Sequence, residues 1–314
     1  MSTRRLPNLL IVGIPKAGTT SLFAYLAQHR DICGCTVKEP GYFDQFSPRR
    51  PANKVPMTIE QYQELFSACG AEQYTMEATP SYCYGGQPTI DAIRSSLPDP
   101  RIIISLRNPT DRLWSAYTFQ RSQGNLPGIR SFAEYLAVCE QRHVDGTDRV
   151  ATDHLQGLAT GFYAEYVPLW VRAFGDHARV IFAEELASQP LAVLHGLCAW
   201  LGIDLPGPET FDLEAKNVTV HARSPHLART VYRLKRAGDR RRMLPGPLRE
   251  RLRRVYLRFN AGGSAGSLPD GMRRRVDGIY EESNREMLRV LNQYGYDRFP
   301  SWLEGRSVAQ SRSS

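Results

Sequence analysis

The chain begins with a strand-like apolar run that ends in a glycine-bounded turn and passes at once into a helical pattern. The apolar run covers Leu9 to Val12, the turn lies between Gly13 and Gly18, and the helical pattern extends from Ser21 to His29. A strand, a glycine-bounded loop and a helix in this order present backbone N–H groups at a helix N-terminus, which favours anions. This feature therefore predicts an α/β fold with an anion-binding loop near the N-terminus.

The loop differs from the Walker A pattern G-x-x-x-x-G-K-[ST] of nucleoside triphosphatases. Gly13 and Gly18 keep the glycine spacing, but Thr19 occupies the lysine position and the lysine comes earlier, at Lys16. Only 5 of the 40 Lys and Arg residues are lysines, and Lys16 and Lys38 are two of them. We interpret both as positions that require a compact ammonium rather than a planar guanidinium.

Two segments resemble the nucleotide-binding motifs of sulfotransferases that use 3′-phosphoadenosine 5′-phosphosulfate (PAPS). Pro15–Leu22 is similar to the loop that binds the 5′-phosphosulfate, and Arg101–Tyr117 is similar to the motif that binds the 3′-phosphate. Both occur in the family's order, and Gly161–Leu186 fits its later half. The resemblance, which is to the heparan-sulfate-type and bacterial branch, covers most of residues 8–300. It implies a single sulfotransferase domain over 1–314, with 1–7 and 305–314 as flexible tails.

Strand-like runs alternate with helical patterns along the chain. This alternation predicts a P-loop-like central parallel β-sheet flanked by helices on both faces. The expected strands are Leu9–Val12, Tyr74–Glu77, Arg101–Leu106 and Arg179–Phe182. The expected helices are Ser21–His29, Ile59–Cys69, Thr89–Leu97, Arg112–Arg121, Phe132–His143, Leu158–Phe174, Pro190–Leu201, Leu248–Asn260 and Asp270–Gln293. The aromatic residues Tyr163, Trp170, Phe174 and Trp200 are expected to pack in the core.

The resemblance implies a donor site for PAPS and its product PAP, and no metal. Lys16 would contact the phosphosulfate and neutralise charge on the bridging oxygen as the S–O bond breaks. Arg107 and Ser115 match the family's positions for the 3′-phosphate, and Arg112 is interpreted as a helix-surface residue, with a second phosphate contact as the alternative. The other donor-binding residues are Ala17, Gly18, Thr19, Thr20 and Ser21.

The proton acceptor is predicted in Lys38–Asp44, which is similar to a lysine–glutamate–aromatic segment of the same branch. The resemblance implies that Glu39 is the base, because an attacking hydroxyl must lose its proton. Lys38 would assist the leaving group or anchor the acceptor; the alternative is a simple ion pair between the two side chains. Lys216 and Arg223 lie where the family often has a basic loop over the donor.

The net charge of +8 is concentrated in runs of arginine between Arg223 and Arg258 and in Arg273–Arg275. A solvated helical face, a surface that attracts anions and a nucleic-acid surface are all compatible with such runs. No nucleic-acid motif accompanies them, so the expected partner is a small-molecule or carbohydrate acceptor. The predicted reaction is sulfuryl transfer from PAPS to a hydroxyl, in preference to an amine, of a sugar, lipid or small natural product. The alternatives are a P-loop nucleotide kinase or hydrolase and a non-catalytic basic module that binds acidic polymers.

A cytoplasmic location is expected, because the sequence shows no signal peptide and no apolar run of about 20 residues. The six cysteines, including the close pair Cys33 and Cys35, are accordingly expected to be free thiols. Mobility is expected in Phe46–Met57, in Ala261–Pro269 and in Asn217–Pro225, the last of which could close over a nucleotide.

Overall fold

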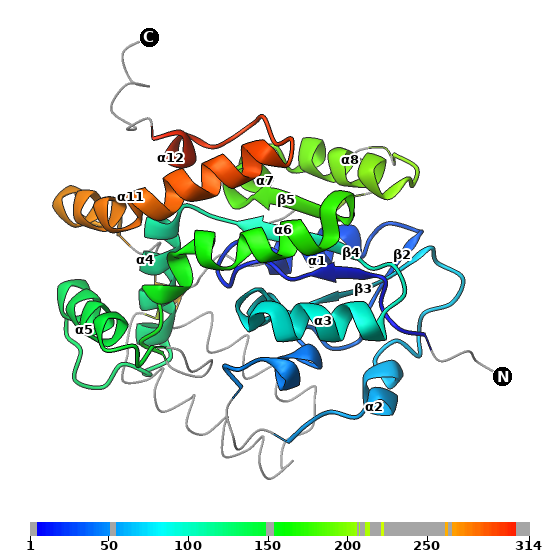
Figure 1. The fold of residues 1–314 in the computed structure, drawn as a ribbon, viewed down its shortest axis with the longest axis horizontal. Helices are drawn as coiled ribbons and strands as arrows, with labels where there is room; N and C mark the ends of the chain where they lie inside the picture. Colours follow the sequence, from blue (N-terminus) through cyan, green and yellow to red (C-terminus); the bar gives the residue numbers. More distant parts are fainter. Residues whose placement is uncertain are drawn as a thin grey trace.

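The centre of the molecule is a five-stranded parallel sheet with the strand order β2-β3-β1-β4-β5 (Figure 1). The computed structural model describes residues 5–50, 55–148, 154–205, 207, 211–213, 221–222, 261–262 and 266–305. The strands are β1 (Leu9–Ile11), β2 (Ile32–Gly34), β3 (Tyr74–Ala78), β4 (Arg101–Leu106) and β5 (Ala178–Phe182). Four of them were predicted. The edge strand β2 was not, because its three residues are too few to show a period.

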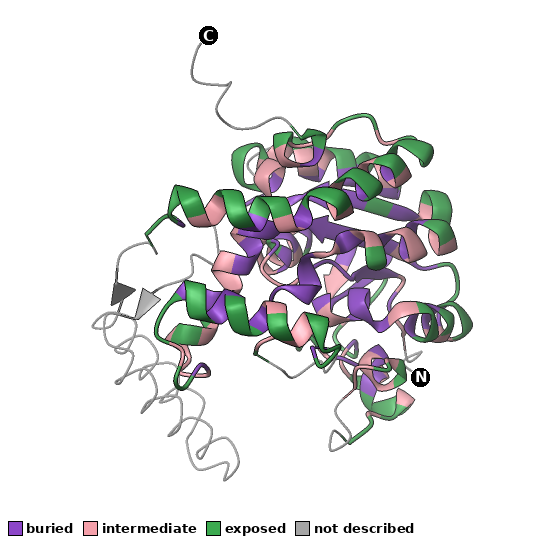
Figure 2. Ribbon diagram, turned by 60° about the vertical axis from the view of Figure 1, so that its left-hand side comes forward, coloured by how far each residue is buried: buried purple, intermediate pink, exposed green. Residues whose placement is uncertain are grey.

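Helices cover both faces of the sheet, as the sequence predicted. They are α1 (Thr19–Leu26), α2 (Ile59–Glu64), α3 (Gly86–Ser96), α4 (Pro109–Ser122), α5 (Phe132–Val144), α6 (Val167–Phe174), α7 (Ala183–Ser188), α8 (Pro190–Leu201), α11 (Asp270–Gln293) and α12 (Ser301–Glu304). Leu9 and Ile11 of β1 pack with α1 and α8, whereas Leu10 packs with α3, α6 and α11. The period of two along the strand therefore separates two apolar layers, and the strands are the most buried elements (Figure 2).

A third apolar cluster extends this core beyond the end of the sheet that carries the anion-binding loop. It joins α4, α5 and α11 through Tyr117, Tyr135 and Tyr280, all nearly inaccessible to solvent. Arg273 and Arg275 of α11 strengthen the same contact, because they form ion pairs with Asp111 of α4 and Glu140 of α5. The short arginine run that the structure describes therefore ties helices together.

The predicted helix over Leu158–Phe174 is wrong in its first half. The chain there forms two 3-10 turns, Ala159–Gly161 and Tyr163–Glu165, and the helix α6 begins only at Val167. Pro168 stands in the first turn of α6, where proline favours a helix start, and Gly161 accepts no side chain because a Cβ there would lie 2.5 Å from the ring of Tyr280. Of the four aromatic residues in question, Tyr163 and Trp170 are buried as expected, and Phe174 and Trp200 are partly buried.

The segments expected to be mobile are described only in part. Arg5, in the expected N-terminal tail, donates to the backbone oxygens of Gly70 and Glu72, so residues 5–7 are not a free tail. His221–Ala222 (β6) pairs antiparallel with Ala261–Gly262 (β7). Residues 51–54, 217–220, 223–225, 263–265 and 306–314 lie outside the described residues, as do the predicted helix 248–260 and the arginine runs 240–242 and 251–254. In the described part, no helix has the length and apolar character that crossing a bilayer requires.

The prediction of six free cysteines is wrong at two positions, because Cys33 and Cys69 form a disulfide. Cys33 lies in β2 and Cys69 follows α2, and the two Cα atoms are 5.6 Å apart across 36 residues of sequence. The approach depends on packing: the N–H of Thr36, just after β2, donates to Leu65 O at 2.9 Å. Disulfides persist mainly in oxidising compartments, so this bond does not favour the cytoplasmic location, which stays a prediction.

We expect the double substitution C33S/C69S to lower the free energy of unfolding by about 2–4 kcal/mol, because the bond closes a long loop in the unfolded chain. Denaturant titration of both proteins measures the loss. A thiol reductant should destabilise the unmodified protein to the same extent and leave the double variant unchanged. Six alkylatable thiols in the unreduced, unfolded protein would contradict the bond.

Candidate active site

The anion-binding loop lies between the end of β1 and the start of α1 and is fixed against β4. Ile14 N donates to Ser105 O at 2.9 Å, and the Ser105 hydroxyl donates to Ala17 O. A Cβ on Gly13 would lie only 2.5 Å from Ser105 N, so this position accepts no side chain. The loop therefore stands at the carboxyl edge of the parallel sheet, where such folds bind their ligands.

The N-terminus of α1 leaves its first backbone N–H groups without a side-chain cap. Gly18 precedes the helix with φ of 80°, a left-handed conformation that favours glycine, and no side chain caps the first turn. Thr19 is buried, whereas Thr20 and Ser21 are partly exposed beside it. The uncapped N–H groups and the positive end of the helix dipole favour a negatively charged ligand here.

Lys16 adds a positive charge in the same loop. Its ammonium lies 4.4 Å from the centroid of the Phe119 ring, and its backbone has φ of 75°. Arg107 Nη1 donates to Lys16 O at 3.1 Å, so the guanidinium lies against the loop. Burial, the charge of Arg107 and an opposing contribution from Glu39 together lower the pKa of Lys16 to about 8. Among the described residues, no carboxylate forms an ion pair with Lys16 or Arg107.

The pKa of Lys16 gives a measurable consequence. We expect the affinity for PAP to fall as the pH rises through about 8, by up to about tenfold per pH unit, because neutral Lys16 loses its attraction for the anion. Calorimetric titration between pH 7 and 9.5 measures this. The Lys16→Arg variant is the matched control: its guanidinium stays charged, so its affinity should remain flat. A flat profile for the unmodified protein would contradict the role of Lys16.

The turn after β4 holds Arg107 in place. The Tyr163 hydroxyl donates to Arg107 O at 2.8 Å, and Asn108 N donates to Glu184 Oε1 at 2.7 Å. The Asn108 side chain then caps α4 by accepting from Thr110 N at 2.9 Å. Ser115 lies farther along α4, partly buried and next to Ala116 of the adjoining cavity. The structure thus brings Arg107 to Lys16 and places Ser115 on the following helix; a shared phosphate stays a prediction.

The predicted base lies near the same lysine. Glu39 is exposed, pairs with Lys38, and contributes to the electrostatic environment of Lys16. Its φ of 59° is unfavourable for a residue with a side chain, and its N–H donates to Ala78 O at 3.0 Å. The ion pair that was the alternative interpretation is therefore present, and it leaves the carboxylate accessible to a ligand.

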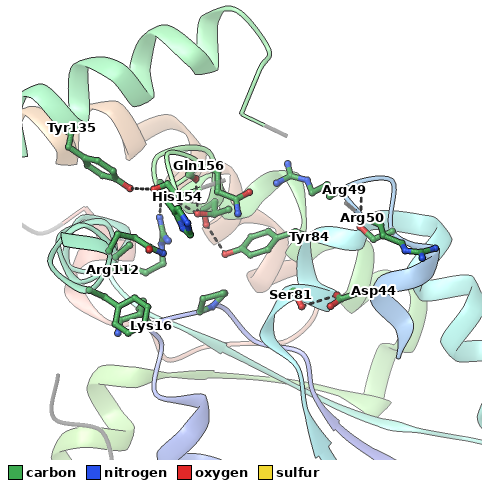
Figure 3. Close-up of a pocket in the computed structure, with 17 residues that line it drawn as sticks. Lys16, Asp44, Arg49, Arg50, Ser81, Tyr84, Arg112, Tyr135, His154 and Gln156 are labelled. Atoms are coloured by element: carbon green, nitrogen blue, oxygen red, sulfur yellow. Dashed lines mark hydrogen bonds between the residues drawn. The ribbon is translucent and has the colours of Figure 1, made fainter. Parts of the chain in front are cut away.

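A cavity of about 390 Å³ opens beside Lys16 (Figure 3). Sequence reasoning did not identify most of its lining, which includes Asp44, Arg49, Ser81, Tyr84, Arg112, Phe119, His154 and Gln156. Asp44 accepts from the Ser81 hydroxyl at 2.8 Å, and Arg49 Nη2 donates to the Tyr166 hydroxyl at 2.7 Å. Ser81 and Tyr84 follow β3, so the rule that ligands bind at the carboxyl ends of strands could have indicated them.

The prediction that Arg112 lies on a helix surface is wrong. Its exposed fraction is 2%, and its guanidinium donates to Gly157 O among buried tyrosines that include Tyr84 and Tyr135. Its Nε has no hydrogen-bond partner, and no described carboxylate pairs with it. The prediction failed because an arginine near the start of a helix is usually solvated. Here residues of α5 and α11, among them Tyr135 and Tyr280, cover the Arg112 side chain. The cavity thus gains a buried positive charge.

The structure does not test the predicted basic loop over the donor. Lys216 and Arg223 lie outside the described residues. No group of three or more His, Cys, Asp or Glu residues suited to a metal ion is present in the part that the structure describes.

Comparison with known proteins agrees with this arrangement. The profile of the sulfotransferase domain matches residues 6–226. Heparan sulfate glucosamine 3-O-sulfotransferase 6 of Mus musculus is 32% identical over 201 residues, which cover 64% of this chain and 53% of that protein. Bifunctional heparan sulfate N-deacetylase/N-sulfotransferase 1 of Caenorhabditis elegans is 26% identical over 303 residues, covering 96% of this chain and 31% of that protein. The chain thus spans about half, or less, of the length of these curated relatives.

A solved structure gives the same fold. The sulfotransferase from Alicyclobacillus acidocaldarius superposes with a TM-score of 0.67 at 23% identity, covering 95% of this chain and 99% of that one. The profile match covers more than half of the 314 residues, and it includes the loop of Lys16, the segment of Glu39 and the turn of Arg107. The chain therefore belongs to the sulfotransferase family.

Proposed function

We propose that this protein transfers the sulfuryl group of PAPS to a hydroxyl group of an acceptor. The observation that carries the proposal is the pair of adjacent cations, Lys16 and Arg107, beside the uncapped N-terminus of α1. Two like charges this close disfavour one another, and no described carboxylate forms an ion pair with either. An anionic ligand relieves that repulsion, and a phosphosulfate offers the charge and the acceptor oxygens that the loop can bind.

The donor site follows the residues of the loop and of the turn after β4. The N–H groups at Gly18 and Thr19 and the Lys16 ammonium would hold the phosphosulfate, while Arg107 and Ser115 would hold the 3′-phosphate. PAPS supplies the activated sulfuryl group and leaves as PAP. The fixed positive charge of Lys16 stabilises the negative charge that grows on the departing oxygen, a type of stabilisation that often dominates group transfer.

Glu39 would remove the acceptor proton. The hydroxyl oxygen forms a bond to sulfur, the bond between sulfur and the bridging oxygen breaks, and the hydroxyl proton passes to the carboxylate. Glu39 is exposed and close enough to Lys16 to influence its charge, which suits a base that works at the transferred group. Lys38, paired with Glu39, would assist the leaving group or anchor the acceptor.

The cavity supports a carbohydrate acceptor that carries an acidic group. Among the described residues that line it, Lys16, Arg49, Arg50 and Arg112 are cationic and Asp44 is the single carboxylate. The hydroxyl groups of Ser81, Tyr84 and Thr160 also line the cavity and can form hydrogen bonds with sugar hydroxyls. The curated relatives are named for heparan sulfate, a sulfated sugar polymer, which agrees with this class of acceptor.

Calorimetric binding of PAP, followed by transfer of labelled sulfate from PAPS to a panel of acidic and neutral oligosaccharides, tests the proposal. We expect PAP to bind and acidic oligosaccharides to be labelled on oxygen, with unchanged rates in EDTA. Phosphoryl transfer from ATP would instead support a kinase. Binding of PAP with no transfer to any acceptor would support a non-catalytic module.

A further inference from the structure

A carboxylate that has no part in the proposed transfer is buried below the segment that carries Glu39. Glu77 of β3 has an exposed fraction of 0%, and no Lys or Arg of the described residues forms an ion pair with it. Three hydroxyl groups donate to it instead: Tyr62 at 2.5 Å, Thr79 at 2.7 Å, and Tyr82. Burying a carboxylate without a cation destabilises the folded protein. Its presence here therefore suggests that its hydrogen bonds serve another purpose.

Two of these hydroxyls connect Glu77 to the segment that follows Glu39. The Tyr82 hydroxyl accepts from Phe43 N at 3.1 Å, and the Thr79 hydroxyl accepts from Gly41 N at a longer 3.4 Å. A hydroxyl has one proton, so donating it to the carboxylate turns its lone pairs toward the two backbone N–H groups. Glu77 thus fixes the direction in which both hydroxyls can bind.

The Glu39 segment depends on such anchors. The positive φ of Glu39 strains the backbone and persists only where the surroundings enforce it. Glu39 N is held by Ala78 O, the residue next to Glu77, at 3.0 Å. The anchors at residues 39, 41 and 43 therefore all come from the end of β3 and the turn that follows it.

We propose that Glu77 is a positioning residue, which holds Glu39 at the transferred group by orienting the hydroxyls of Thr79 and Tyr82. This inference rests on the proposed function of Glu39 as the base. The ionised carboxylate is the effective form, because a protonated carboxyl must itself donate and would compete with a backbone N–H for a hydroxyl lone pair. The position of Glu39 and the rate of sulfuryl transfer should therefore both depend on the charge of Glu77.

The surroundings of Glu77 set the pH at which this dependence occurs. Burial raises its pKa to about 7, against the three hydroxyl bonds, which lower it. The groups that face it are Tyr62 from α2, Thr79 and Tyr82 after β3, Cys35 after β2, and Asp44 from the 3-10 turn Phe43–Phe46. Burial raises the pKa values of both tyrosines well above their usual range and raises the pKa of Cys35 to about 12, so these three stay neutral. Glu77 is thus a group of this cluster whose pKa lies near neutrality, so the Glu39 segment should be firmly held above about pH 7 and looser below it.

The first test is Glu77→Gln, which keeps the shape and removes the charge. We expect kcat to fall about 10- to 100-fold, as for a displacement of about 1 Å, while PAP affinity stays within about twofold. The fall of kcat below pH 7 should disappear in the variant. Tyr82→Phe, which removes one anchor and keeps Glu77, should lower kcat in the same way, and it replaces the first variant if that one does not fold.

Tyr62→Phe is the matched control, because the Tyr62 hydroxyl donates to Glu77 and to no atom of the Glu39 segment. It should move the low-pH limb of kcat to higher pH and leave the plateau unchanged. Hydrogen exchange of the Gly41 and Phe43 amides gives a readout independent of activity. Their protection should weaken below pH 7 in the unmodified protein and at every pH in Glu77→Gln.

The outcomes separate this inference from the proposed function. Wild-type kcat together with wild-type amide protection in Glu77→Gln would overturn the inference and leave the transfer reaction standing. Equal losses of kcat and PAP affinity would also overturn it, since they indicate a general structural role. If the unmodified protein transfers no sulfate, the proposed function fails, and the amide protection still decides whether Glu77 holds the segment.

Discussion

Replacing Lys16 by alanine is expected to lower kcat/KM for PAPS by about 100- to 1,000-fold, the cost typical of removing one donor that stabilises a transition-state charge. The ammonium is the one lysine charge in the loop, and it stands beside Arg107 at the start of α1. Its removal takes away the charge that opposes the growing negative charge on the departing oxygen. Initial rates with labelled PAPS at saturating acceptor measure the loss.

The matched control for this prediction is Arg285→Ala, which removes one positive charge from an exposed position of α11. That variant should keep its kcat/KM, so a loss in Lys16→Ala cannot come from net charge alone. The free energy of unfolding should not fall in Lys16→Ala, because burial and the charge of Arg107 both disfavour the ammonium in the free protein. Activity within threefold of the unmodified protein would remove Lys16 from the mechanism.

Glu39→Gln is expected to lower kcat by about 100- to 10,000-fold while PAP binds as before, because a carboxamide of the same shape cannot take up the acceptor proton. Because Glu39 is exposed, the substitution should leave the protein folded, so a lower kcat would not be due to unfolding. Single-turnover transfer measures the chemical step, and calorimetry with PAP measures donor binding. The two results together separate a base from a donor-binding residue.

Glu64→Gln is the control for this variant, since it neutralises another exposed carboxylate on the neighbouring helix α2. It should transfer sulfate at the normal rate. Unchanged transfer in Glu39→Gln would show that another group takes the proton. Asp44, which lines the cavity and accepts from Ser81, would then be the next carboxylate to replace.

The conformation of the loop that carries Lys16 was predictable because its signals are local. Glycine at residues 13 and 18, the lysine at residue 16 and the helical pattern that follows all report on the backbone within a few residues. The structure gives each one a physical reason: a Cβ at Gly13 would collide with Ser105, and Gly18 has positive φ. The turn at Arg107 was predictable for the same reason, because strand, Asn cap and proline follow in order.

The cavity beside Lys16 was only partly predictable, because its walls come from segments far apart in the sequence. Asp44 lay within the segment singled out for Glu39, but Arg49 belonged to a stretch expected to be mobile. Tyr84 and Arg112 reach the cavity from different elements, and Tyr84 O–H donates to Thr160 O at 3.1 Å across 76 residues. No local sequence pattern indicates that two segments so far apart in the sequence lie next to each other.

The sequence by itself determined the parallel α/β architecture, the glycine-bounded loop between β1 and α1 and the family, since these follow from the order of residues along single strands, turns and helices. Only the tertiary structure decided that Cys33 bonds to Cys69, that Arg112 is buried and that Glu77 lies below the Glu39 segment. The reason is physical: burial and long-range contact depend on which elements cover a side chain. A charged residue or a cysteine has the same letter in the sequence whether water or another helix surrounds it.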